Sequence, residues 1–358
     1  LGTPPLRELA AGVAGRDEGD AVIVISDITR AVPNRVFLPP IIATLHAAGF
    51  RRERIVILVA TGMHRPSTPA EHLELVGPDI ARSYRLVDHR AEDPTGLVEL
   101  PGKTPSGATV RIDAIYHRAA LRIVTGFIEP HFMAGFSGGR KAICPGLVDL
   151  ATVQEFHGAK VLADPRSSLG VLDGNPCHRI ALEVARRVPP QFILNVTVNT
   201  RGELTGVFAG ELEAAHLAGV EFVRRHTEVW ADRPFDAVLA SGGGYPLDTT
   251  FYQAVKGMCV AAELVGPGGV VALAAGCAQG IGSAEYRQTL FEYADDYRRF
   301  LRDILARAET RKDQWEFQMQ TRVLEKTGKA GLVVLTDGIG GHELRRCHVT
   351  PAAEVVGE

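Results

Sequence analysis

The most informative segment of this sequence is 129–141, which reads Glu-Pro-His-Phe-Met-Ala-Gly-Phe-Ser-Gly-Gly-Arg-Lys. It contains His131, three glycines and Lys141, and it follows an apolar run, 121–128, that is typical of a buried strand. Glycines allow backbone N–H groups to approach an anion closely, and a lysine beside them can supply a counter-charge or a covalent anchor. The segment therefore predicts a cradle for a cofactor.

Three further polar clusters stand at the ends of predicted strands or after a glycine-rich loop. They are Asp27-Ile28-Thr29-Arg30, the segment 61–65 with His64, and the helical segment that carries Tyr252, Gln253 and Lys256. Function collects at the carboxyl ends of the strands in open α/β sheets. The coincidence of four clusters at such positions is stronger evidence for a site than any one of them.

Each residue also has a structural interpretation when it is taken alone. An arginine such as Arg30 can bind a carboxylate through two hydrogen bonds, and a loop histidine such as His64 can act as a general base near neutral pH. Equally, Asp27 could cap a helix, His64 could bond to backbone, and Lys141 could be a surface lysine. For Trp315, the default interpretation is a core residue.

The glycine pattern argues against two common cofactors. A phosphate loop of the form GxxxxGK ending at Lys141 would need a glycine where Arg140 stands, and the loop does not fit GxGxxG either. ATP and a nicotinamide dinucleotide are therefore disfavoured. His157 lies on a predicted helix, 150–162, and could ligate a metal, but no HxxxH pair accompanies it, so a zinc site made only of protein ligands is not expected.

Strand and helix signals alternate along the chain and predict the fold. Strands are expected at 21–26, 54–60, 110–113, 121–128, 237–240, 269–275 and 331–335, and helices at 38–50, 211–225 and 249–265. Thr68, Pro69 and Glu71 form a capping-box pattern that starts another helix. This rhythm predicts an α/β fold of two domains, each with a mostly parallel sheet flanked by helices.

The segment 229–234 breaks the pattern and predicts a domain boundary. We expect an N-terminal domain over residues 1–230, which contains His64, His131 and Lys141, and a C-terminal domain over 231–358, which contains Tyr252, Gln253 and Lys256. The active site is expected in the cleft between them. Because the chain begins at Leu1 and ends abruptly, we expect both ends to be truncated.

Composition sets the class of protein. The 358 residues are 46% hydrophobic and 23% charged with a formal charge of −3, which gives no reason to expect nucleic acid or a membrane surface as a partner. No apolar run approaches the ~20 residues of a membrane helix. The five cysteines are far apart and odd in number, which favours reduced thiols in a cytoplasmic enzyme.

Taken together, these motifs resemble the nickel-dependent lactate racemase family, whose members use a nickel-pincer nucleotide. The resemblance runs from about Ala21 to about Thr327. It is carried by Asp27-Ile28-Thr29-Arg30, Thr61-Gly62-Met63-His64-Arg65-Pro66, His131 through Lys141, Pro145-Gly146, His157, Gly243-Gly244-Tyr245-Pro246-Leu247-Asp248, Tyr252 through Gly257, and Asp313-Gln314-Trp315. These motifs occur in order with compatible spacing.

The resemblance implies a role for each site residue. Lys141 would form the covalent link to the cofactor, a pyridinium-3-thioamide-5-thiocarboxylic acid mononucleotide, and His157 would complete the coordination of nickel. His64 and His131 would be the two acid/base catalysts. The remaining roles would be cofactor contacts from Asp27, Ile28, Thr29 and Arg30, and substrate binding by Arg30, Tyr252, Gln253, Lys256 and Trp315.

The implied activity is that of an isomerase that racemises or epimerises 2-hydroxy acids. Lactate is favoured, with malate or another 2-hydroxy acid close behind. Ala31, Met63 and Met133 depart from the family pattern beside the site, so the identity of the acid stays open. The reaction would be a proton-coupled hydride transfer to the cofactor through a 2-keto acid. Cofactor-synthesis enzymes would be transient partners; the oligomeric state is not predicted. Two alternatives are an inactive binding protein on this fold and a nicotinamide-dependent 2-hydroxy-acid dehydrogenase.

Overall fold

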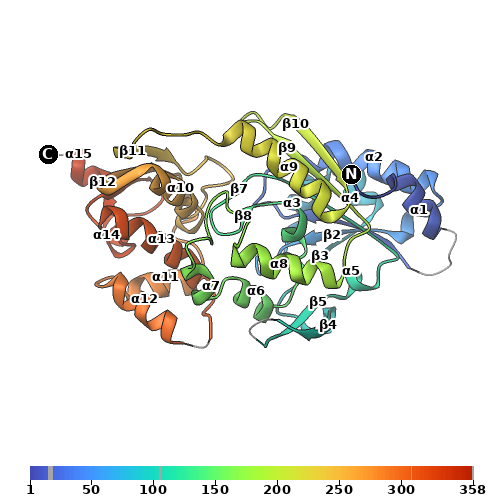
Figure 1. Cartoon of the computed structure of the whole chain (residues 1–358), viewed down its shortest axis with the longest axis horizontal. Coiled ribbons are helices and arrows are strands. Elements are labelled where there is room, and N and C mark those ends of the chain that lie inside the picture. The colour runs from blue at the N-terminus through green and yellow to red at the C-terminus, as the bar shows by residue number, and fades with distance from the viewer. Residues whose placement is uncertain (15–18, 105–106, 308, 357–358) are drawn as a thin grey trace. The chain divides into compact units, whose positions relative to one another are not determined.

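The chain forms two compact units, each built on its own mostly parallel sheet (Figure 1). The computed structural model describes residues 1–14, 19–104, 107–307 and 309–356. Unit 1 comprises Leu1–Phe156 and Gly170–Glu228, and unit 2 comprises His157–Leu169 and Val229–Glu358. The sequence pattern predicts a single boundary near residue 230; the structure in addition groups the short segment His157–Leu169 with unit 2.

Unit 1 contains a six-stranded sheet in the order β10-β9-β6-β1-β2-β3. Its strands are parallel except β10, which pairs antiparallel with β9. The strands are β1 (Ala21–Ser26), β2 (Ile55–Ala60), β3 (Arg85–Asp88), β6 (Leu121–Phe127), β9 (Phe192–Val198) and β10 (Leu204–Gly210). Strands β1 and β2 are apolar and buried along most of their length, as expected for parallel strands covered on both faces.

Helices and short turns surround the strands of unit 1. They are α1 (Leu6–Ala14), α2 (Asn34–Ala47), α3 (Pro69–Val76), α4 (Pro78–Ser83), α5 (Ala114–Arg118), α6 (Leu150–Phe156), α8 (Pro176–Arg187) and α9 (Leu212–Thr227), with 3₁₀ turns η1 (Arg52–Arg54), η2 (Pro94–Gly96) and η3 (Gly139–Ala142). Helix α9 packs along β9 and β10 (Figure 1). The capping box predicted at Thr68 and Glu71 is present, and a hydrogen bond from Arg65 lowers the pKa of Glu71 to about 2.

Two small antiparallel pairs complete unit 1. Strand β4 (Leu97–Lys103) pairs with β5 (Thr109–Asp113), which is the strand predicted at 110–113 and lies outside the main sheet. Strand β7 (Pro130–His131) pairs with β8 (Gly135–Phe136) in a tight hairpin just after β6. This hairpin lies in the glycine-rich segment 129–141, so it determines where the chemistry-bearing side chains of that segment point.

Unit 2 contains a four-stranded parallel sheet in the order β11-β12-β13-β14. The strands are β11 (Phe235–Ser241), β12 (Val265–Ala274), β13 (Leu332–Leu335) and β14 (Thr350–Pro351), and the helices are α7 (Ala159–Ala163), α10 (Phe251–Leu264), α11 (Ala284–Glu292), α12 (Tyr297–Ala306), α13 (Gln314–Thr327), α14 (Gly341–Arg346) and α15 (Ala352–Val356). Helices α10 and α13 pack against each other and against β12. They therefore form the inner layer that positions the candidate residues of this unit.

The single helix predicted over 150–162 is wrong. Helix α6 ends at Phe156, and α7 begins at Ala159, with Gly158 as its N-cap in an extended conformation. Glycine is a poor helix former, so a break at Gly158 costs little. His157 therefore lies between two helices, at the point where the chain leaves unit 1 for unit 2.

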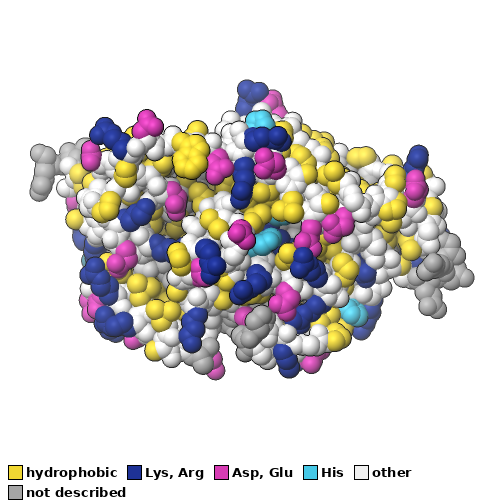
Figure 2. Space-filling view, in the orientation of Figure 1, with side chains coloured by type: hydrophobic (Ala, Val, Ile, Leu, Met, Phe, Trp, Pro, Cys, Tyr) yellow, Lys and Arg dark blue, Asp and Glu magenta, His cyan; other side chains and the backbone are white. Residues whose placement is uncertain are grey.

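The surface carries charges of both signs, and the cysteines are buried as free thiols. Figure 2 shows lysine and arginine side chains interspersed with aspartate and glutamate on the face drawn. Within the described ranges, every helix is too short or too polar to cross a bilayer. All five cysteines are buried, and none of them is in a disulfide.

The buried ring of His348 makes stability depend on pH. Burial, and then the charge of Lys329, lower its pKa to about 4, below the ~6.5 of an exposed histidine. Between pH 4 and ~6.5 the unfolded chain therefore binds more protons than the folded one. The stability that the neutral His348 ring contributes is fully present above pH ~6.5 and is lost as the pH falls toward 4. We expect the melting temperature to fall over this range, and less steeply in His348→Asn, since asparagine accepts the backbone φ of +62° there. Thermal scans of both proteins at pH 7 to 4.5 measure the two slopes, and equal slopes would contradict the assignment.

Candidate active site

The candidate residues of unit 1 follow three adjacent parallel strands. Strand β1 lies between β6 and β2, so the loops at the carboxyl ends of these strands are neighbours. Asp27 follows β1, His64 follows β2, and His131 follows β6. This is the edge where ligands bind in open α/β sheets, as the sequence predicts.

Asp27 holds His64 in one orientation. Oδ2 of Asp27 lies 2.6 Å from Nδ1 of His64, while Oδ1 accepts hydrogen bonds from the backbone N–H and the hydroxyl of Thr29 at 3.2 and 2.6 Å. Burial by itself raises the pKa of the Asp27 carboxyl, but His64, Thr29 and Arg30 outweigh it and lower that pKa. The carboxylate therefore accepts a proton-bearing Nδ1, and Nε2 of the neutral ring is left as the basic nitrogen.

His131 and Lys141 form the second contact of the site. Nδ1 of His131 lies 3.2 Å from the backbone nitrogens of Met133 and Ala134, and both N–H groups donate to it. The neutral ring therefore carries its proton on Nε2, which lies 3.2 Å from Nζ of Lys141. A hydrogen bond donated by Nε2 requires a lone pair on the amine, and the unprotonated amine is the nucleophilic form.

Contacts between loops join these two pairs. Nη1 of Arg30, after β1, lies 3.7 Å from a carboxylate oxygen of Glu129, after β6. The backbone N–H of Gly62, after β2, donates to the carbonyl of Gly146 at 2.9 Å. Gly62 has a φ of +57°, and an added Cβ would lie 3.3 Å from the carbonyl oxygen of Pro145, so glycine suits this approach. The loops after β1, β2 and β6 are therefore held together.

The glycine loop is fixed from behind by β9 and α9. Asn195 of β9 accepts a hydrogen bond from the N–H of Gly139 at 2.8 Å. A Cβ added at Gly138 or Gly139 would lie 2.9 Å from Ile128 or 2.8 Å from His216, and both glycines have a positive φ. These two positions therefore require glycine, and they fix the turn η3 that carries Lys141.

Unit 2 holds the remaining predicted residues in two groups. The ring of His157 stacks on Trp315 with centroids 4.5 Å apart, and Nε1 of Trp315 donates to the hydroxyl of Tyr252 at 2.7 Å. On α10, the amine of Lys256 donates to the side-chain oxygen of Gln253. Trp315 is buried, which agrees with the core interpretation, and its contact with His157 leaves its role in the site a prediction.

Gln253 and Trp315 are placed by the start of a helix. Thr250 is the N-cap of α10, where its hydroxyl accepts from the N–H of Gln253 at 3.3 Å. Asp313 precedes α13 in a left-handed conformation and accepts a hydrogen bond from Ser283. Trp315 therefore lies in the first turn of α13, and Gln253 in the first turn of α10.

The structure thus groups the predicted residues into small sets. It joins Asp27, Thr29 and His64, it joins His131 and Lys141, and it joins Arg30 to Glu129. In unit 2, one group comprises His157, Trp315 and Tyr252 and the other comprises Gln253 and Lys256. Ile28 differs from the rest, since its side chain packs against the hydrophobic core of unit 1.

The donor set suits a cofactor that brings most of its own metal ligands. In the part of the chain that the structure describes, no three His, Cys, Asp or Glu side chains gather closely enough to hold a metal ion. The imidazole of His157 is a ligand type that nickel accepts, but one imidazole is too few to hold an ion. The amine of Lys141 offers a covalent attachment point. A cofactor bound to Lys141 or to His157 would therefore have to bring further metal ligands of its own.

Comparison with known proteins identifies the family. Residues 2–170 match the lactate racemase N-terminal domain, and residues 231–357 match the lactate racemase C-terminal domain. A lactate racemase from Thermoanaerobacterium thermosaccharolyticum is 36% identical over 357 residues, which are 99% of this chain and 81% of that protein. The chain belongs to the lactate racemase family. It is therefore an isomerase of the racemase class.

Further relatives agree with this assignment. A lactate racemase from Lactiplantibacillus plantarum is 37% identical over 326 residues, which are 90% of this chain and 75% of that protein. The solved structure of the lactate racemase apoprotein from Thermoanaerobacterium thermosaccharolyticum has a TM-score of 0.90 at 36% identity and covers 98% of this chain and 82% of that chain. A crystal structure of a Thermotoga maritima protein shares the fold, with a TM-score of 0.71 at 19% identity and coverage of 97% of this chain and 90% of that one. The family and the fold class predicted from the motifs are confirmed.

Several residues that contact the candidate site residues are absent from the sequence-based prediction. Glu129 pairs with Arg30, and Arg140, Asn195 and His216 support the glycine loop. A signal exists for two of them: Asn195 is a polar residue inside an apolar strand, and His216 lies on the apolar side of an amphipathic helix. These signals do not show that the side chains contact the same glycine loop, because that contact depends on how β9 and α9 pack.

Replacing the Asp27 carboxylate tests its hold on His64. In Asp27→Asn the amide can donate to Nδ1 and favour the other tautomer, so we expect kcat to fall by about 10²- to 10⁴-fold. Asp88→Asn is the matched control, because Asp88 bonds to His72 at 2.8 Å in another carboxylate–histidine pair of unit 1. Turnover rates of the cofactor-loaded variants measure the effect; equal losses in both variants would contradict a specific role for Asp27.

Proposed function

We propose that the chain racemises a 2-hydroxy acid, with lactate as the favoured substrate and malate or a related acid next. The observation that supports this most directly is the state of the two histidines. His64 has Nδ1 bound to a carboxylate and a basic Nε2, whereas His131 has Nδ1 bound to backbone N–H groups and a proton on Nε2. Two imidazoles that are fixed in orientation at one edge of a sheet suit a reaction that removes a proton on one side of the substrate and returns one on the other.

We propose that Lys141 carries a nickel-pincer nucleotide through a covalent bond and that His157 ligates its nickel. Asp27, Ile28, Thr29 and Arg30 would contact the cofactor, with Ile28 contributing its backbone. The bound group supplies an acceptor for the hydride from C2 of the substrate. The amine of Lys141 is suited to attachment, since it lies beside the Nε2–H of His131 and over the ring of Phe156 at 5.3 Å.

The two histidines then move the hydroxyl proton. C2–H of a 2-hydroxy acid is too weakly acidic for easy abstraction, but its loss as hydride becomes easier when a base takes the hydroxyl proton at the same time. His64 is that base for one enantiomer, and the product is a planar 2-keto acid. After the keto acid turns over in place, the other imidazole, once it has taken up a second proton from solvent, would return a proton to the keto oxygen. Both rings re-equilibrate with solvent between turnovers.

Cationic and amide side chains would orient the substrate. Lys256 and Arg30 would bind its carboxylate, with Gln253 holding the Lys256 amine. Tyr252 and Trp315 would line the pocket, where the hydrogen bond between them fixes both rings. In this proposal the N-terminal domain carries the anchor and the proton-transfer groups, and the C-terminal domain carries the substrate-binding groups. We further propose a cytoplasmic enzyme that meets the cofactor-synthesis enzymes transiently.

The activity is tested by loading the protein with the nickel-pincer nucleotide and incubating it with single enantiomers of lactate, malate and other 2-hydroxy acids. Chiral chromatography is expected to show racemisation of at least one acid, and intact mass to show an adduct that Lys141→Arg lacks. His64→Asn and His131→Asn should keep the adduct and lose at least about 10²-fold in rate. His46→Asn, a histidine bonded to Phe50 and Tyr84, is the control and should keep full activity.

The other outcomes each exclude part of the proposal. Racemisation without an adduct on Lys141 would overturn the assigned anchor. Binding of a 2-hydroxy acid without any racemisation would favour a binding protein on this fold. Absorbance from a reduced nicotinamide, formed when that dinucleotide is added with the acid, would favour a dehydrogenase.

Removing the Lys256 charge tests substrate binding separately from proton transfer. In Lys256→Met we expect KM to rise by about 10- to 100-fold, which corresponds to the loss of one charge-assisted hydrogen bond, with a smaller change in kcat. Lys326→Met is the matched control, because the Lys326 amine donates to the carbonyl of Ala262 at the other end of α10. Initial rates across substrate concentration separate the two constants. An unchanged KM in Lys256→Met would contradict the assignment.

A further inference from the structure

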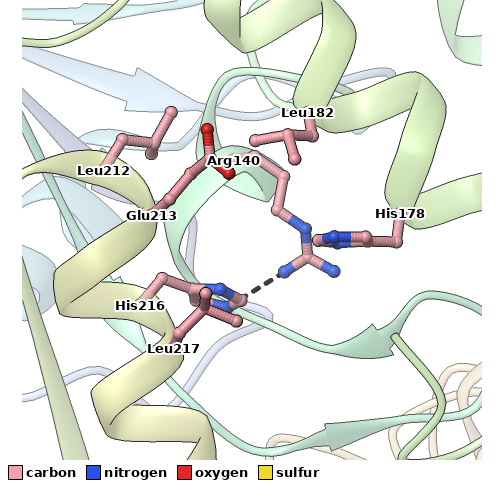
Figure 3. A pocket seen from close by; sticks show the side chains of 7 residues that line it. All are labelled: Arg140, His178, Leu182, Leu212, Glu213, His216 and Leu217. Carbon is pink, nitrogen blue, oxygen red and sulfur yellow. Dashed lines mark hydrogen bonds between the residues drawn. The ribbon is translucent and has the colours of Figure 1, made fainter. Parts of the chain in front are cut away.

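A buried arginine lies directly behind the glycine loop. Arg140 is only 1% exposed, and its guanidinium points between His178 of α8 and His216 of α9 (Figure 3). Among the described residues, no carboxylate forms an ion pair with it, although Glu213 lines the same small cavity. Burying a charge is costly unless hydrogen bonds compensate for the lost water. The partners that Arg140 does have therefore indicate what it is for.

Those partners belong to the loop that carries the predicted chemistry. Nη2 of Arg140 donates to the carbonyl of Ala134 at 2.8 Å, and Nη1 donates to the carbonyl of Gly138 at 3.3 Å. Ala134 is one of the two residues whose N–H donates to Nδ1 of His131. The Gly138 carbonyl also accepts the backbone N–H of Lys141 at 3.1 Å. One guanidinium thus spans from the residue that orients His131 to the turn that presents Lys141.

Of the three side chains Arg140, His178 and His216, only Arg140 carries a positive charge at pH 7. Burial and the charge of Arg140 lower the pKa of His178 to about 4 and that of His216 well below its usual value, so both rings are neutral at pH 7. Burial lowers the pKa of Arg140 to about 9, which still leaves it protonated. Nε2 of His216 lies 3.0 Å from Nη1 of Arg140 and 2.9 Å from the carbonyl of Ser137. Nε2 of His216 can make only one of these bonds at a time. A bond to Nη1 links α9 to Arg140, and a bond to the Ser137 carbonyl links α9 to the glycine loop.

We propose that Arg140 is a positioning residue that holds the His131–Lys141 pair in its reactive arrangement. Its planar fork reaches two carbonyls that are four residues apart, whereas a lysine amine is a single point donor. The catalytic role of this arrangement rests on the proposed function, whereas the arrangement itself can be tested without it. Its structural content is that Lys141 reacts as a neutral amine because Arg140 fixes the backbone around His131.

The test uses the protein without cofactor. A small acetylating reagent labels amines at pH 7, and mass spectrometry of peptides gives the labelling ratio of Lys141 to Lys329, an exposed lysine of the same molecule. We expect Arg140→Met to lower this ratio about tenfold, since a protonated amine does not attack, and Arg140→Lys to lower it less. Arg122→Met is the matched control, because Arg122 also donates to carbonyls, those of Pro189 and Ala119, away from the loop. Its ratio should equal that of the wild type.

Kinetics of the loaded enzyme give a second readout. A loss of positioning in Arg140→Lys lowers kcat while KM changes less, because Gln253 and Lys256 are untouched. A merely structural role predicts instead that Arg140→Met and Arg122→Met lose thermal stability and labelling ratio together. That result overturns the proposal. So does a Lys141-to-Lys329 labelling ratio within twofold of wild type in Arg140→Lys and in any folded Arg140→Met. A reactive Lys141 in a protein that racemises nothing would refute the proposed function and leave this inference standing.

Discussion

The structure of the site depends on which atoms bind Nδ1 of its two histidines. In His64 that nitrogen faces the Asp27 carboxylate, and in His131 it faces two backbone N–H groups. A carboxylate stabilises a protonated Nδ1 and N–H donors stabilise a bare one, so the two rings are held as opposite tautomers. Each then presents Nε2 in a defined state, one basic and one protonated. Nε2 of His131 is also the atom that faces the amine of Lys141.

Backbone geometry is what makes this possible in His131. Two N–H groups can reach one ring nitrogen only because the chain turns sharply between β7 and β8, and the glycines after β8 let η3 fold back against β9 and α9. The tautomer of His64 is set instead by a tertiary contact, because Asp27 follows β1 and His64 follows the neighbouring parallel strand β2. A local turn and a sheet register thus control the same property of two similar side chains.

The sequence predicts the elements and the reactive side chains better than it predicts their partners. Capping at Thr68 and the buried strands follow from local patterns, and the motifs lead to the family, whereas the roles of His131 and Lys141 stay predictions. The break at Gly158 was not predicted, because a glycine near a helix end is ambiguous without its tertiary surroundings. The same limit applies to Asp27, which looks like a cap or a cofactor contact until β1 and β2 are paired.

The support of the glycine loop shows why such partners are hard to read from a sequence. Arg140, Asn195 and His216 come from η3, β9 and α9, and each has an ordinary interpretation in its own element. Their meaning lies in the shared acceptor groups of the loop. An apolar residue at position 140 would avoid the cost of burying a charge, yet it would leave the carbonyls of Ala134 and Gly138 without these donors. The buried charge is therefore explained by the backbone that it holds, since the hydrogen bonds it makes are those that direct His131 and Lys141.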